Sequence, residues 1–279
     1  MTTTSRTLNR CPFLYGESPL WASGFGQDEV GYYAEFSLPT GDNYWDRVTQ
    51  RMRWIPPGAF MMGSPETELR REEDELLHEV IISRGYWLAE TACTQRLWRA
   101  VMQENRSRFQ GDERPVENVS YADVESFVAK LNERFPSSRF AMPSEAQWEY
   151  ACRAGTSTPF SFGETIHTYQ ANFDGNFPYG NAPKEQYRGE TVVVKSLPAN
   201  AWGLYEMHGN VWEWCADWYG EYSKERQIDP TGGKSGSNRV IRGGGWFNYA
   251  RNVRSACREG FAGYRDRVNN LGLRLMSTA

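Results

Sequence analysis

The sequence predicts an α+β fold with few helices, short strands and much irregular structure. Amphipathic segments with capping residues occur only between positions 94 and 155. After Gly155, glycine, asparagine, tryptophan and tyrosine dominate, and no long helical period survives. A composition of 14% aromatic residues, 26 glycines and only 24% charged residues is typical of many short strands joined by ordered loops.

Helical periodicity and capping residues predict three helices, over 94–103, 120–135 and 144–155. Each begins at a Thr or Ser whose side chain can accept a hydrogen bond from an amide of the first turn. In the third helix, Ser144 and Gln147 form the capping-box pattern.

Strands are expected where apolar and polar residues alternate or where short apolar runs occur. The expected ranges are 31–38, 48–55, 80–87, 191–195, 211–215, 239–243 and 271–276. The acidic run from Glu66 to Glu75 is expected to be a solvated loop. Because no repeat or linker is visible, we expect one domain over 1–279, with 1–50 as an N-terminal extension packed on it.

The charge of the chain excludes some partners. The formal net charge is −4, and no block of lysine or arginine stands out, so nucleic acid is not an expected partner. Residues 1–10 are polar, and neither a signal peptide nor an apolar span is visible. We therefore expect no membrane association and a cytoplasmic location.

The metal-binding residue types form no local motif. The cysteines are widely spaced, odd in number and lack any CxxC pair, which disfavours zinc and predicts mostly buried free thiols. They are Cys11, Cys93, Cys152, Cys215 and Cys257. The three histidines, His78, His167 and His208, stand in separate contexts and predict no metal pair.

A series of short sequence motifs gives the strongest indication of the family. In chain order they are Phe60–Ser64, His78–Val80, Arg114–Val116, Met142–Tyr150, Ala171–Asp174, Gly203–Trp214, Arg242–Trp246 and Leu271–Leu275. Between Arg53 and Met276 they closely resemble the formylglycine-generating enzyme, or sulfatase-modifying factor, family. The resemblance implies a C-type-lectin-like α+β fold.

The chain departs from this family at the copper site. The family's enzyme oxidises a sulfatase cysteine to formylglycine with copper held by two cysteines. Carried over from Arg242, those positions fall on Asn248 and Val253. Copper(I) needs soft thiolate ligands, and the nearby Cys257 is out of register. We therefore expect no copper and no formylglycine-generating activity.

The resemblance also implies calcium, a hard ion that carboxylate and carbonyl oxygens bind. One set maps to Asn172, Phe173, Glu185 and Tyr187, and a second to Glu206, Gly209, Val211 and Glu213. The alternative for the second set is that its two glutamates only hydrogen-bond within a tight turn.

The segment 246–270 reads as a rigid frame that holds changeable residues. It resembles the C-terminal variable segment of proteins diversified by retroelements, which use the same fold to display a ligand-binding surface. The frame arginines, which are Arg251, Arg254, Arg258 and Arg267, would hold loop carbonyls. Aromatic, Asn and Gly residues suit an adaptable surface. The candidate ligand-binding residues are Phe247, Asn248, Tyr249, Asn252, Cys257, Glu259, Phe261, Tyr264, Asp266, Asn269 and Asn270. The alternative is a loop packed on the domain.

Two functional hypotheses follow. The first is a non-catalytic protein whose C-terminal surface binds an unknown protein or small-molecule ligand, with Phe247, Tyr249, Phe261 and Tyr264 partly exposed on one face. The second is an oxidoreductase or other modifying enzyme with a changed cofactor. One scaffold hosts many functions, so fold alone does not choose between them.

Overall fold

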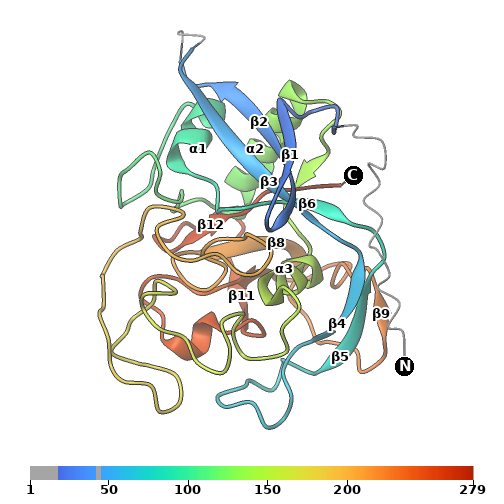
Figure 1. The fold of residues 1–279 in the computed structure, drawn as a ribbon, viewed down its shortest axis with the longest axis vertical. Coiled ribbons are helices and arrows are strands. Elements are labelled where there is room, and N and C mark those ends of the chain that lie inside the picture. The colour runs from blue at the N-terminus through green and yellow to red at the C-terminus, as the bar shows by residue number, and fades with distance from the viewer. Residues whose placement is uncertain (1–17, 42–44, 279) are drawn as a thin grey trace.

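The computed structural model describes residues 18–41 and 45–278. The polar N-terminal stretch and Cys11 therefore lie outside the described residues. Within the described residues, three helices and three sheets are joined by long irregular connections, most of them after Gly155 (Figure 1). The expected α+β class is confirmed.

The largest sheet joins both ends of the described chain. Its six strands, in spatial order, are β1 (Gly24–Asp28), β2 (Gly31–Pro39), β3 (Arg47–Ile55), β6 (Tyr86–Ala89), β13 (Met276–Thr278) and β7 (Phe140–Ala141). The first three strands form an antiparallel meander, and β13 near the C-terminus inserts between β6 and β7. The described part of the N-terminal extension is thus paired with the rest of the fold through β2 and β3.

Helices α1 (Gln95–Met102) and α2 (Tyr121–Arg134) pack on each other beside this sheet. Trp98 and Phe127 stack between them with ring centroids 4.9 Å apart. Both side chains belong to a core that also holds Phe36 and Trp87 from the sheet. The apolar face predicted for the second helix is therefore the face that packs against the first helix and the sheet, and this burial stabilises the helix.

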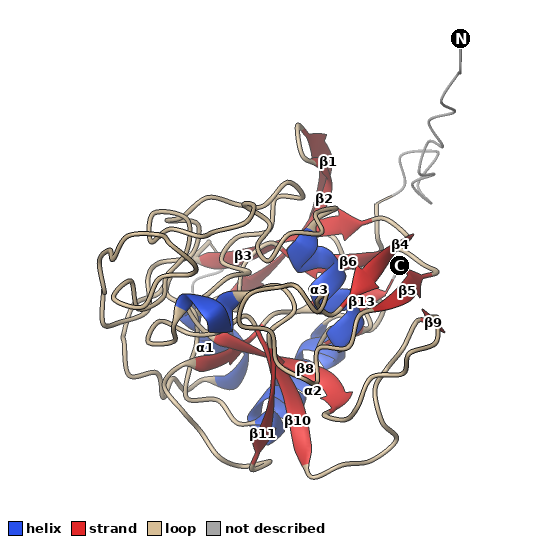
Figure 2. Cartoon of the chain, turned by 90° about the horizontal axis from the view of Figure 1, so that it is seen from below, coloured by secondary structure: helices blue, strands red, loops and turns tan. Residues whose placement is uncertain are grey.

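Two smaller sheets form the other half of the molecule, with helix α3 (Glu145–Arg153) packed against both (Figure 2). One has the order β11 (Arg258–Ala262), β10 (Asn238–Arg242), β8 (Trp212–Trp218) and β12 (Leu271–Leu273). The other has the order β4 (Gly58–Met62), β5 (His78–Ile82) and β9 (Gln227–Ile228).

The helix predictions hold in detail. Ser120 with Asp123, and Ser144 with Gln147, form the reciprocal bonds of capping boxes. Thr94 caps α1 by accepting from the Leu97 amide. In the described part of the chain no helix combines the length and the apolar character that crossing a membrane needs.

Several strand predictions were wrong. The range 80–87 is split between β5 and β6. The range 191–195 forms no strand, because its amides find partners outside any ladder: Val192 donates to Asn210 Oδ1 and Val194 to the Glu113 carbonyl. Strands β1, β4 and β11 were not expected from the sequence, since their alternation is short or interrupted by glycine.

The acidic run is not wholly solvated, which corrects a second expectation. The side chains of Glu68 and Glu75 are only 3% and 0% exposed, and both pair with Arg254 at 2.6 Å. Burying a carboxylate is costly unless it is paired, so these contacts fold the loop onto the C-terminal segment. Periodicity along the loop carries no trace of this distant partner.

Candidate ligand-binding site

Buried arginines fix the segment 246–270 from inside. Arg242 at the end of β10 is fully buried, and its Nη1 donates to the carbonyls of Ala256 (2.8 Å) and Cys257 (2.5 Å). Its Nη2 donates to the Ser255 carbonyl at 3.0 Å and pairs with Glu149. A guanidinium supplies five donors in one plane, so a single side chain clamps three consecutive residues.

Arg254 and Arg251 have different roles. Arg254 is buried and donates to the carbonyls of Arg251 (2.9 Å) and Arg70 (3.0 Å), as expected for a frame arginine. Arg251 was expected to be structural too, but its side chain is exposed. Its guanidinium carbon lies 5.8 Å from the centre of the Tyr249 ring.

The turn after Trp246 is held by Asn248. The side-chain oxygen of Asn248 accepts from the Gly245 amide and from Trp212 Nε1, both at 2.9 Å. Its backbone carbonyl accepts from the Asp174 amide at 2.8 Å. Asn248 therefore anchors the turn, and the neighbouring rings project from a fixed backbone.

Four exposed rings lie on this turn or against it as two groups, one at Tyr249 and one at Trp246, and together we call them the aromatic patch: Phe177, Tyr187, Phe247 and Tyr249. Their exposed fractions are 47%, 41%, 40% and 39%. Phe177 and Tyr249 stack with centroids 4.0 Å apart. Tyr187 stacks on the buried Trp246, with ring centroids 6.1 Å apart. Phe247 contacts the same Trp246 ring edge-on, with centroids 5.0 Å apart.

Half of this patch lies outside the predicted segment. Phe177 comes from the loop after Ala171, and Tyr187 was considered only as a source of a calcium-binding carbonyl. No sequence signal marks either ring as a surface residue beside Tyr249. They meet the turn because the loop 174–187 folds over it, as the Asp174–Asn248 hydrogen bond shows.

The other two predicted rings lie elsewhere. Phe261 is half-buried and packs edge-on against Trp214 at 5.5 Å. Tyr264 is 48% exposed but lies over Tyr121 of α2 at 5.9 Å, with its hydroxyl on Glu125. No ring contact between described residues joins this pair to the aromatic patch.

The remaining candidates differ in accessibility. Glu259 and Asp266 are exposed, Asn252 and Asn269 are half-buried, and Cys257 and Asn270 are buried. Cys257 belongs to the main core, and burial raises the pKa of its thiol to about 12. These last two side chains cannot contact a ligand in this structure and are removed from the candidate set.

The copper positions lack the chemistry that copper needs. Asn248 is engaged as described, and Val253 is fully buried with its carbonyl on His208 Nδ1 at 2.7 Å. Neither residue carries sulfur, and copper(I) requires soft ligands. The four described cysteines are free and buried, as expected. The residues present do not fit a two-thiolate copper site.

The second calcium set does not fit an ion site as it is arranged. Both carboxylate oxygens of Glu213 accept from Arg274, at 2.8–3.1 Å, and one also accepts from Trp148 Nε1 at 2.7 Å. The carboxylate charge is thus neutralised by a buried guanidinium. Glu206 is different: its oxygens make no hydrogen bond of ordinary geometry to a described residue. Burial raises its pKa to about 7, although the nearby backbone amides of Lys195 and Leu197 act in the opposite direction.

The first calcium set, like the second, combines one engaged carboxylate with one residue whose buried oxygen lacks a partner among the described residues. The side-chain oxygen of Asn172 is buried and has no partner in the described part of the chain, which is the kind of atom that a hard cation would satisfy. Phe173 is buried beside it in sequence. The carboxylate of Glu185 is occupied, since it accepts from His167 Nδ1 (2.6 Å) and the Thr168 amide (2.5 Å). Across the described residues, no group of three or more His, Cys, Asp or Glu side chains is arranged to hold a metal.

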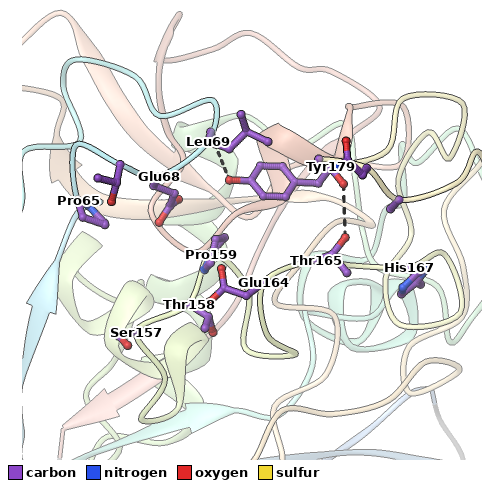
Figure 3. A pocket seen from close by; sticks show the side chains of 14 residues that line it. Pro65, Glu68, Leu69, Ser157, Thr158, Pro159, Glu164, Thr165, His167 and Tyr179 are labelled. Carbon is purple, nitrogen blue, oxygen red and sulfur yellow. Dashed lines mark hydrogen bonds between the residues drawn. The ribbon is translucent and has the colours of Figure 1, made fainter.

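Two neighbouring grooves share the side chain of Tyr179, and the second of them borders the segment 246–270. The first, about 760 Å³, is lined by residues that include Glu68, Glu164 and His167 (Figure 3). The second, about 670 Å³, is lined by Phe177 and Tyr249 of the aromatic patch. Tyr179 lines both, and its hydroxyl donates to the Leu69 carbonyl across the boundary.

Known proteins share this architecture. The model of the Sulfatase-modifying factor enzyme 1-like domain matches residues 45–279. The formylglycine-generating enzyme of Mus musculus is 30% identical over 191 residues, which are 65% of this chain and 48% of that enzyme. The inactive C-alpha-formylglycine-generating enzyme 2 of the same species is 30% identical over 181 residues, 60% of this chain and 50% of that protein. The chain thus spans about half the length of these curated relatives.

A solved structure extends the likeness to the whole fold. Treponema denticola variable protein 1 superposes with a TM-score of 0.74 at 26% identity, covering 88% of this chain and 99% of that one. The expected family and its C-type-lectin-like fold are therefore confirmed. The chain belongs to the sulfatase-modifying factor, or formylglycine-generating enzyme, family.

Proposed function

We propose that this protein is a non-catalytic ligand-binding protein that uses the turn 246–252 as its recognition surface. The observation that carries the proposal is the aromatic patch, four rings of 39–47% exposure. Phe247 and Tyr249 stand on a turn that Asn248 and buried arginines fix, and Phe177 and Tyr187 come from the loop that folds over it. Clustered exposed rings mark interaction sites, and a fixed backbone lowers the entropy lost on binding.

The residues at the copper positions support a function without the family's oxidation chemistry. Asn248 serves the architecture of the turn and Val253 serves the core. Each position thus has a structural role, one as a hydrogen-bond acceptor in the turn and one as an apolar core residue. A thiolate that binds a metal would not perform either role.

Retroelement diversification of this surface is a further part of the proposal. Its support is the likeness to a variable protein and the exposure of Phe247 and Tyr249 among buried frame residues. Sequencing the DNA around the gene tests it: a near-copy of the coding segment for 246–270 beside a reverse-transcriptase gene is expected. An isolated gene would overturn this part and leave ligand binding untouched.

Ligand binding is tested by ligand-observed NMR with a fragment library. We expect a set of fragments to bind the wild-type protein and to lose that binding in the double variant Phe247→Ala, Tyr249→Ala. The matched control is Tyr169→Ala, which removes a ring that is 64% exposed and stacks only on His167 among the described residues. If the double variant and the control retain the same fragments as wild type, the proposed surface is wrong.

A further inference from the structure

We propose that the second groove is a site for an anionic aromatic ligand, that is, a planar ring that bears a phosphate or carboxylate. This inference rests on the proposed function and names the chemistry that the same surface recognises. The groove has a volume of about 670 Å³, which is within the range of small-molecule sites.

Positive charge lines the groove without compensation. Arg70, Lys184 and Arg251 all line it, and no aspartate or glutamate does. All three side chains are exposed, and no carboxylate of the described residues lies within salt-bridge distance of them. The nearby Glu68 is already paired with Arg254.

This arrangement contrasts with the rest of the molecule. The chain has a formal net charge of −4, and its buried arginines are matched by glutamates, as in the Arg242–Glu149 and Arg274–Glu213 pairs. Three unmatched cations around one hollow therefore create a local positive potential that favours an anion. Guanidinium groups suit phosphate and carboxylate because both present paired acceptor oxygens.

The wall of the groove supplies the aromatic part of the recognition. Phe177 and Tyr249 line it as a stacked pair, 4.0 Å apart and inclined by 29°. Arg251 lies over the Tyr249 ring, 5.8 Å from its centre. A planar ligand ring packed against this pair would lie in the same groove as Arg70, Lys184 and Arg251.

The position of Arg70 is fixed by the fold. Its carbonyl accepts from Arg254 Nη2 at 3.0 Å, and its backbone has a φ of 61°. A left-handed backbone is uncommon for a non-glycine residue, so the loop is held in a specific conformation here. The buried pairs of Arg254 with Glu68 and Glu75 thereby place one wall of the groove.

The probe for this site is phenyl phosphate, with inorganic phosphate and phenol as separate tests of charge and ring. Isothermal titration calorimetry should show that phenyl phosphate binds at least about tenfold more tightly than either partial probe. Arg251→Gln should weaken phenyl phosphate about tenfold or more, since hydrogen bonds to charged groups are worth that much. Lys184→Gln should weaken it in the same direction.

The control is Lys224→Gln, which removes the same charge from an exposed lysine that does not line this groove. It should leave the affinity for phenyl phosphate unchanged. Equal affinity in wild type, Arg251→Gln and Lys184→Gln would overturn the proposal, as would binding of phenol as tight as that of phenyl phosphate. If neutral fragments still depend on Phe247 and Tyr249 in that case, the proposed function stands and only the ligand class is wrong.

Discussion

At the scale of single residues, buried polar groups are satisfied by specific distant partners. His208 is an example: Nδ1 donates to the Val253 carbonyl at 2.7 Å, and Nε2 accepts from the Ser161 amide at 3.1 Å. The imidazole is therefore held in its neutral form. Burial lowers the pKa of His208 to about 4 from an ordinary value of 6.5, and protonation would leave a charge in the core.

This predicts a specific dependence of stability on pH. The folded-state pKa of His208 lies below the unfolded one, so the unfolded state takes up the proton first and stability falls as pH falls from 6.5 to about 4. Over that window, wild type should lose about 1.4 kcal/mol per pH unit relative to His208→Gln. Denaturant unfolding of both proteins at several pH values measures the difference. Parallel curves would show that His208 does not carry the effect.

At the scale of elements, the segment 246–270 divides into parts with different surroundings. The turn around Phe247 and Tyr249 presents its rings to solvent, whereas β11 packs Phe261 on Trp214. A surface that is displayed and a strand that completes a sheet thus follow each other within fifteen residues.

Alanine substitutions should separate these parts. Phe247→Ala and Tyr249→Ala should each cost only about 1 kcal/mol of unfolding free energy, because two fifths of each side chain is already exposed in the folded protein. Phe261→Ala should lower the unfolding free energy by about 2 kcal/mol or more, since the loss should approach that of a buried phenylalanine. Thermal and urea unfolding of the three variants measures this order. If Phe247 and Tyr249 cost as much as Phe261, the turn is core and the recognition surface must be abandoned.

At the scale of the whole molecule, the family's fold is retained, and the positions that the resemblance assigns to copper hold Asn248 and Val253. Trp214 lies in the core that the largest sheet shares with α1 and α2, and Trp148 of α3 lies in a second core. Arginine–glutamate pairs such as Arg242–Glu149 tie the C-terminal segment to this scaffold. The turn 246–252 therefore rests on a scaffold that buried packing and charge pairs hold in place.

The protein should not convert a sulfatase-type cysteine peptide into an aldehyde, because Asn248 and Val253 offer no thiolate. Mass spectrometry of the peptide after incubation with copper and oxygen measures this. The same preparation should contain no stoichiometric redox metal. Copper-dependent loss of the peptide thiol, or a bound redox metal, would instead favour the oxidoreductase hypothesis.

Calcium should raise the melting temperature through the site around Asn172, whose side-chain oxygen lacks a partner among the described residues. At a hundred times the dissociation constant the stabilisation is about 2.7 kcal/mol. Scanning calorimetry in calcium, in magnesium and with a chelator tests this. Three identical melting temperatures would exclude a stabilising calcium site.

The sequence by itself determined the features that local chemistry encodes. Capping residues such as Ser144 and the spacing of apolar residues predicted all three helices. The order of the short motifs along the chain indicated the family. The residue types at positions 248 and 253, aligned by the resemblance, predicted that the copper thiolates are absent. Each of these inferences depends on residues that are neighbours in sequence or on the residue type at one position. None of them requires knowledge of the packing.

Only the tertiary structure decided which residues surround the turn 246–252. Phe177 stacks on Tyr249 across 72 positions, and Glu75 pairs with Arg254 across 179. Loops without periodicity bring these residues together, so no local pattern predicts which side chains become neighbours. For the same reason the four predicted rings separated into two places, and an arginine expected in the frame lies at the edge of the groove. Burial and charge pairing between distant segments, which follow from packing alone, set the site.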